Sequence, residues 1–204
     1  MADEGRRMIM RHVPVLGAAL LLLVSCGQSE PSRLYTLSAA SELAGDGIDD
    51  LAVGVGPITL PQYLDRPQIV TRVGANRLEV AEFDRWAEPL SATVPRVITE
   101  NIGAELGTDR VYVLPRRRRT QIDFAVEIEF IRFESTSEGD ALLVARWELF
   151  SGGGNEPLFE EKAEIRDSVG QPGDYGLIAA GLSNALAELS GEIAQEIARR
   201  LSAE

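Results

Sequence analysis

The sequence predicts a single α+β domain in which a mostly antiparallel mixed sheet carries two main helices on one face. Residues 122–133 and the two stretches that follow them alternate apolar and charged side chains, which is typical of strands in a half-buried sheet. Residues 175–201 instead place leucines and isoleucines at helical spacing. The length of 204 residues suits one ordinary domain preceded by a leader.

The N-terminal residues 1–25 have the pattern of a bacterial lipoprotein signal peptide. After a start containing three arginines comes a mostly apolar run, 13–24, which is shorter than the roughly 18 residues that a membrane-spanning helix needs. Small Ser25 then stands directly before Cys26, the only cysteine of the chain. We therefore expect residues 1–25 to be removed, Cys26 to carry lipid and 26–32 to form a tether. An ordinary signal peptide cleaved near Ser25 is the alternative.

Lipid on Cys26 would hold the domain 33–204 to a membrane, because several acyl chains together bind durably. Gly27 follows the cysteine. Under the sorting rule of enteric bacteria, the absence of aspartate there favours the outer membrane, facing the periplasm. The true start codon stays open among Met1, Met8 and Met10.

Composition excludes most catalytic chemistry. The only histidine, His12, lies in the leader, and Cys26 is expected to be lipidated. The mature domain would therefore lack an imidazole base, a thiol nucleophile and His or Cys ligands for zinc. We expect no cofactor and no metal. A net charge of −12 also argues against nucleic-acid binding, which needs clustered Lys and Arg.

The first half of the domain reads as short strands joined by irregular segments. Residues 33–37 and the apolar run 51–58 are expected strands, separated by a small, acidic loop. Gly54 and Gly56 could suggest a nucleotide-binding loop, but the third glycine of that motif is absent and Pro57 follows. These glycines therefore indicate a bulge or close packing.

Proline governs the next segment. Pro61 and Pro67 keep residues 60–67 out of a regular helix. Residues 69–72 can then pair with residues 78–81 as a hairpin, because Gly74-Ala75-Asn76 suits a turn.

A helix is expected from a cap at Asp84 to Leu106, with Gly107 as its stop. Pro89 and Pro95 disturb its first half, so the pattern is firm only from residue 96. A strand at 111–114 follows. The dense basic cluster Arg116, Arg117, Arg118 and Arg119 comes next and could contact lipid phosphates or an acidic partner, or could be a solvated loop.

The strands 122–133, 143–149 and 159–166 form an expected antiparallel meander with one wet face. Glu127 and Glu129 share that wet face and could be proposed as paired catalytic acids, although active carboxylates usually need burial. The closing helix 175–201 most simply packs on the sheet, and contact with another subunit is its alternative use.

Several blocks in order resemble the PqiC-like family of ABC-type transport auxiliary lipoproteins. They are the Cys26 lipobox, Arg33-Leu34-Tyr35-Thr36-Leu37, the long run from Val53 to Arg72 that includes Leu60-Pro61-Gln62-Tyr63-Leu64-Asp65-Arg66-Pro67, and Arg85-Trp86-Ala87-Glu88-Pro89-Leu90. The resemblance implies a noncatalytic subunit of an intermembrane lipid-transport system that maintains outer-membrane integrity. Its implied partners are a mammalian-cell-entry (MCE) domain membrane protein with its ABC permease and ATPase, or a paired inner-membrane protein. A homo-oligomer stays open.

The proline-rich segment is the expected docking feature, because it is polar, stiff and irregular. Its candidate residues are Pro61, Tyr63, Asp65, Arg66, Pro67 and Arg72. The alternative is a stabilising loop with Tyr63, Leu64 and Ile69 turned inward. Two other functions stay open: a stand-alone envelope lipoprotein that binds lipid or assists outer-membrane assembly, and a carboxylate-dependent envelope hydrolase.

Overall fold

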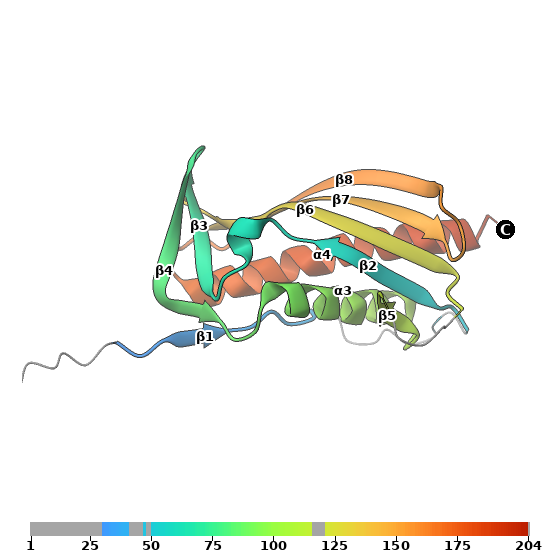
Figure 1. Cartoon of the computed structure of the whole chain (residues 1–204), viewed down its shortest axis with the longest axis horizontal. Helices are drawn as coiled ribbons and strands as arrows, with labels where there is room; N and C mark the ends of the chain where they lie inside the picture. Colours follow the sequence, from blue (N-terminus) through green and yellow to red (C-terminus); the bar gives the residue numbers. More distant parts are fainter. Residues whose placement is uncertain (1–29, 41–46, 48–49, 116–120, 204) are drawn as a thin grey trace, which may run out of the picture. The chain divides into compact units, whose positions relative to one another are not determined.

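A computed structural model describes residues 30–40, 47, 50–115 and 121–203, and the chain from Ser32 onward forms one compact unit. In the described residues of this unit, an open eight-stranded sheet is accompanied by two α-helices and a short 3-10 helix (Figure 1). The prediction of a single α+β domain is therefore confirmed. Within the described ranges, no helix combines the length and hydropathy needed to cross a bilayer.

The strands are β1 (Arg33–Tyr35), β2 (Val53–Thr59), β3 (Gln68–Gly74), β4 (Arg77–Trp86), β5 (Val111–Val113), β6 (Phe124–Thr136), β7 (Asp140–Ser151) and β8 (Pro157–Ser168). They are ordered β1-β4-β3-β6-β2-β5, and β7 and β8 continue the sheet from the other edge of β6. A short 3-10 helix, η2 (Gln62–Leu64), lies between β2 and β3.

The predicted meander is confirmed. Strands β6, β7 and β8 are antiparallel neighbours, with Ile128 opposite Trp147 and Ala145 opposite Ala163. Their apolar residues face the helices, whereas Glu127 and Glu129 are exposed on the other face. The predicted hairpin is the antiparallel pair β3 and β4.

Four pairings in the sheet are parallel, namely β1 with β4, β2 with β5, β2 with β6 and β3 with β6. These pairings join strands that are distant in the sequence. The alternation of residues within a strand does not reveal which distant strand it pairs with. The sheet therefore contains more parallel pairings than its antiparallel hairpins alone would suggest.

Helices α3 (Leu90–Leu106) and α4 (Tyr175–Leu201) pack against each other and against the same face of the sheet (Figure 1). The predicted stripes are buried, including Val94 and Ile102 on α3 and Leu186 and Ile193 on α4. Asp174 caps α4 by accepting hydrogen bonds from the backbone N–H groups of Gly176 and Leu177.

The predicted start of the first helix at Asp84 is wrong. β4 runs through Trp86, and α3 begins at Leu90 after Pro89, whose carbonyl accepts hydrogen bonds from the N–H groups of Ala92 and Thr93. Asp84 instead lies buried in β4 and binds Arg33. The prediction used only the local spacing of Asp84 from the apolar stripe. In the structure this carboxylate instead binds Arg33, which is distant in the sequence. The predicted helix stop at Gly107 is confirmed, with a left-handed backbone.

Candidate functional site

The predicted site residues divide into three groups. Cys26 and the cluster Arg116–Arg119 lie outside the described residues. Glu127 and Glu129 are exposed on the sheet, where Glu127 lies opposite Glu148 and the Glu129 carboxylate is 3.6 Å from the Arg146 guanidinium. This open arrangement lacks the buried environment that an active carboxylic acid usually needs. The remaining candidates belong to the segment 60–72.

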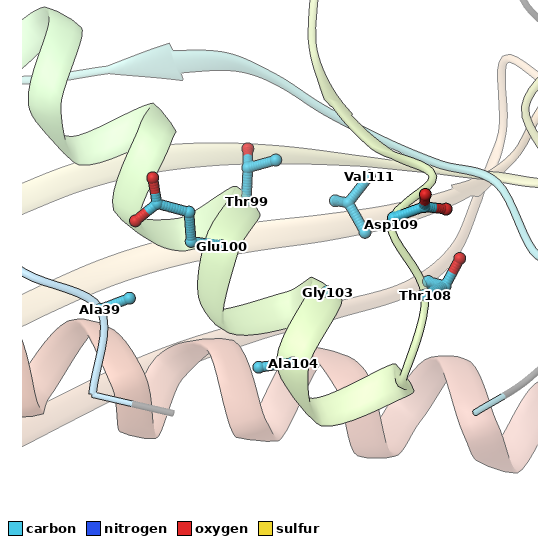
Figure 2. A pocket seen from close by; sticks show the side chains of 8 residues that line it. All are labelled: Ala39, Thr99, Glu100, Gly103, Ala104, Thr108, Asp109 and Val111. Carbon is cyan, nitrogen blue, oxygen red and sulfur yellow. The ribbon is translucent and has the colours of Figure 1, made fainter. Parts of the chain in front are cut away.

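A cavity of about 450 Å³ lies between α3, the chain after β1 and the start of β5 (Figure 2). It is lined by Ala39, Thr99, Glu100, Gly103, Ala104, Thr108, Asp109 and Val111. Glu100 is paired with Arg96 on the same helix, at 3.1 Å. None of the predicted site residues is among these lining residues, and the carboxylates among them are Glu100 and Asp109.

The segment 60–67 crosses an opening in the sheet. β2 pairs with the first half of β6 as far as Glu129, whereas β3 pairs with the same edge only at Ser135 and Thr136. The chain between β2 and β3 therefore runs beside a part of β6 that neither strand covers. This position explains why the segment is irregular.

Backbone hydrogen bonds hold the segment in one shape. The N–H groups of Leu64 and Asp65 donate to the carbonyls of Pro61 and Gln62, and the N–H of Trp86 donates to the carbonyl of Pro67. Leu64 and Ile69 are buried in the core. The segment is thus a rigid turn fastened to the domain.

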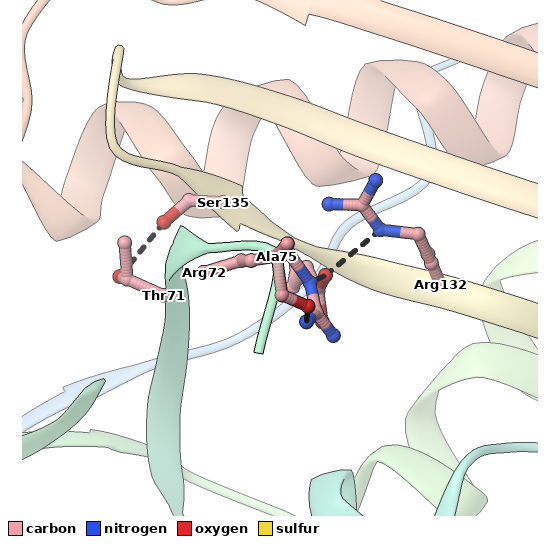
Figure 3. A network of polar contacts seen from close by, with 6 residues as sticks. Thr71, Arg72, Ala75, Arg132 and Ser135 are labelled. Carbon is pink, nitrogen blue, oxygen red and sulfur yellow. Dashed lines mark hydrogen bonds and ion pairs between the residues drawn. The ribbon is translucent and has the colours of Figure 1, made fainter. Parts of the chain in front are cut away.

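Under this turn, the buried Glu134 forms a cluster with Arg72 and Arg132. Figure 3 labels the two arginines of this cluster. The Glu134 carboxylate accepts hydrogen bonds from the Nε atoms of Arg72 and Arg132, the latter at 2.9 Å. The Arg72 guanidinium also lies over the Tyr63 ring, 5.8 Å from its centroid. The cluster joins the segment and β3 to β6.

Glu134 remains a carboxylate in spite of its burial. Burial alone would raise the pKa of Glu134, but interactions with Arg72, Tyr63 and Arg132 outweigh this effect and hold the pKa below its ordinary value. Among the described residues the buried Tyr63 hydroxyl has no hydrogen-bond partner, and burial, together with the nearby Glu134, raises the pKa of Tyr63 to about 12. Tyr63 therefore stays neutral.

The candidate docking residues accordingly have two different positions. Tyr63 and Arg72 turn toward Glu134. The stabilising-loop alternative expects the inward position of Tyr63, whereas it does not include Arg72. Asp65, Arg66 and Pro67 are exposed. Pro61 is half-buried at the edge of the turn.

Asp65 and Arg66 border a second cavity, of about 230 Å³, between the turn and the start of α3. Asp65 and Arg66 line it together with Ile58, Leu60, Pro61, Gln62, Leu64, Pro89, Leu90 and Ser91. A cavity lined by several apolar residues and by two opposite charges can hold an apolar side chain and orient the polar groups around it.

Sequence reasoning missed Glu134. The signal that could have found it is the end of the alternation in residues 122–133, because an acid after Phe133 falls beyond the regular pattern. In the structure the register shifts between Phe130 and Arg132, so that Phe130 and Phe133 both face the core. Glu134 then points under the turn.

A second polar cluster fastens the first strand. Arg33 donates two hydrogen bonds to Asp84, at 2.7 and 2.9 Å, and the Tyr35 hydroxyl donates a third at 2.8 Å. The hydrogen bond from Arg33 lowers the pKa of Asp84 more than burial raises it. β1, where the described domain begins, is thereby tied to β4.

Comparisons with known proteins agree with this fold. The profile of the family described as "ABC-type transport auxiliary lipoprotein component" matches residues 35–194. A crystal structure of an uncharacterized protein is 18% identical, with a TM-score of 0.67, over 82% of this chain and 99% of that chain. A Xanthomonas campestris protein of the DUF330 family is 16% identical, with a TM-score of 0.64, over 79% and 92%. At these identities the two structures show the fold alone. A search of curated proteins found no match.

Proposed function

Because the chain belongs to the family of ABC-type transport auxiliary lipoprotein components, we propose that it is a noncatalytic subunit of an intermembrane lipid-transport system. In this proposal its partner is an MCE-domain membrane protein with an ABC permease and ATPase or a paired inner-membrane protein. The system would maintain outer-membrane integrity. Lipid on Cys26 would hold the domain at the outer membrane, facing the periplasm.

The observation that carries the proposal is the cavity that Asp65 and Arg66 line together with several apolar residues. The turn is rigid, because its backbone is hydrogen-bonded and Leu64 is buried beneath it. A rigid surface loses little conformational freedom on binding, which favours association. The partner would insert an apolar side chain into the cavity and present a basic group to Asp65 and an acidic group to Arg66.

The buried cluster supports this surface from below. Arg72 and Tyr63 hold the turn on β6 through Glu134, so their role in docking would be to position the turn. The cluster Arg116–Arg119 would add a contact with lipid phosphates or with an acidic partner surface.

Partner capture tests the proposal. The full-length protein is purified gently in detergent from its own membranes, and co-purifying proteins are identified by mass spectrometry. We expect an MCE-domain protein together with a permease or ATPase. Recovery of the protein alone, or with an outer-membrane assembly factor, would instead favour a stand-alone lipoprotein.

A matched pair of variants localises the contact. Asp65→Ala/Arg66→Ala should reduce captured partner about tenfold and leave the melting temperature nearly unchanged, because both side chains are exposed. The control Arg77→Ala/Glu79→Ala removes an exposed ion pair of the β3–β4 hairpin and should leave capture intact. Equal loss in both variants, or a marked fall in melting temperature for the first, would contradict docking at this turn.

A further inference from the structure

β8 is an edge strand with a long open side. It spans the 12 residues Pro157–Ser168 and pairs with β7, and no other described strand pairs with it (Figure 1). From Phe159 to Ser168 its register with β7 is regular. An open edge of this length offers a row of unpaired N–H and C=O groups to another strand.

The outward face of β8 has an alternating order of charges. Glu160, Lys162, Glu164 and Arg166 follow one another on this face, and all four are exposed. Arg166 is paired with Asp140 at 3.2 Å. Within the described part of the chain, Glu160, Lys162 and Glu164 form no ion pair.

We propose that β8 pairs with β8 of a second copy of this chain, antiparallel and centred on Ala163. In this register Glu160 lies opposite Arg166 of the other copy, and Lys162 lies opposite Glu164. Twofold symmetry repeats both pairs, so four opposite-charge pairs line the outer face of the seam. The pairing does not depend on which transport system the protein serves.

The charge order selects this register among its neighbours. A slip of two residues in one direction brings Lys162 opposite Lys162 of the other copy, and a slip in the other direction brings Glu164 opposite Glu164. A slip of one residue would turn the charged face of one strand against the apolar face of the other. On the helix side, Ala163 meets itself and Glu161 meets Ile165, so no like charges lie directly opposite one another.

The charges on the neighbouring strands favour the same arrangement. Glu160 lies beside Glu148, which in turn lies opposite Glu127, so three carboxylates form a row across β6, β7 and β8. Like charges in adjacent cross-strand positions are unfavourable. Arg166 of the second copy would stand at the open end of this row and offset the repulsion.

Co-purification tests the pairing in the full-length protein. Two copies with different tags are expressed together, extracted in excess detergent, and recovered through one tag. Lys162→Glu places a carboxylate opposite Glu164 in both equivalent pairs and should reduce recovery of the second tag about tenfold. The charge swap Lys162→Glu/Glu164→Lys should restore recovery, because opposite charges face each other again.

Disulfide trapping tests the register. Glu160→Cys/Arg166→Cys should give a covalent dimer in membranes, because these positions are opposite between copies but about 20 Å apart within one strand. The control Glu160→Cys/Glu164→Cys should link poorly, and the parent protein with Cys26 alone sets the background.

Three results would overturn the proposal. They are equal trapping in the two cysteine pairs, no trapping at all, and cross-linking of β8 to a different protein. Recovery unaffected by Lys162→Glu, or not restored by the swap, would equally overturn it.

Discussion

Arg72 and Glu134, 62 residues apart in the sequence, form an ion pair in which the glutamate side chain is completely buried. The pair links β3 to β6 near the point on β6 where the pairing with β2 has ended and the pairing with β3 begins. It also fixes the turn that presents Asp65 and Arg66. We therefore expect changes at the buried pair to affect the stability of the domain, and changes at the exposed Asp65 and Arg66 to affect docking.

Removing the arginine of this pair should strongly destabilise the domain. Arg72→Ala leaves the buried Glu134 with Arg132 as its remaining arginine, and we expect a loss of about 3 kcal/mol in the free energy of unfolding. Denaturant unfolding measures this loss. Arg77→Ala, which breaks an exposed pair, should cost less than about 1 kcal/mol. Similar costs for the two variants would refute the structural role of the buried pair.

Acid should weaken the fold through Glu134 and Asp84. Burial would raise the pKa of Glu134, but the interactions with Arg72, Tyr63 and Arg132 lower this pKa by more than burial raises it. The pKa of Asp84 is also lowered, mainly by the hydrogen bond from Arg33. The folded state then binds fewer protons than the unfolded chain. This stabilisation is complete above the ordinary carboxyl pKa, about 4, and is lost as the pH falls through the lowered values.

Asp84→Asn checks this dependence. The variant should be less stable than the parent at pH 7, and the difference should shrink as the pH falls below about 4. Denaturant midpoints measured at several pH values give the comparison. A difference that stays constant with pH would mean that the charge of Asp84 is not what the fold uses.

Glu192 has the opposite dependence. Burial, followed by the nearby Glu161 and Glu188, raises the pKa of Glu192, and its Oε2 atom has no hydrogen-bond partner in the part of the chain that the structure describes. The folded state therefore loses stability as the pH rises through the carboxyl range. Glu192→Gln should stabilise the domain by about 0.5 kcal/mol at pH 7, because the side chain is only partly buried, and the gain should vanish at pH 4. A gain that persists at pH 4 would exclude the charge as its cause.

Two glycines of α4 should respond oppositely to alanine. A Cβ at Gly181 would lie 2.6 Å from a methyl carbon of Val169 and 2.9 Å from the Cβ of Ala141, so Gly181→Ala should cost about 1 to 3 kcal/mol. A Cβ at Gly191 meets no atom of the described residues within 4 Å, so Gly191→Ala should stabilise by about 0.5 to 1 kcal/mol. Thermal unfolding of both variants measures the contrast. A stabilised Gly181→Ala protein would mean that α4 packs less closely on the sheet than described.

Part of the candidate site could be predicted from the sequence. Pro61 and Pro67 marked the segment as irregular, and its exposed residues Asp65 and Arg66 do lie on the surface. The roles of Tyr63 and Arg72 could not be separated from theirs, because all four are polar residues of one segment. Only their distance from Glu134 distinguishes them.

The sequence by itself determined the kind of each main element. Alternation along 122–133 and the helical stripe along 175–201 are local periodicities, and burial of one face requires a strand in the first case and a helix in the second. The hairpins followed as well, because their turns join strands that are adjacent in the chain.

Only the tertiary structure decided which distant residues meet. Asp84 reads locally as a helix cap, but Arg33 and Tyr35 reach it because β1 pairs with β4. Glu134 reads as one more surface acid, but it is buried because β2 ends early on β6 and the turn covers the gap. Local periodicity reflects which face of an element is buried, whereas a charge is stabilised by whatever partner the whole chain brings within hydrogen-bond distance.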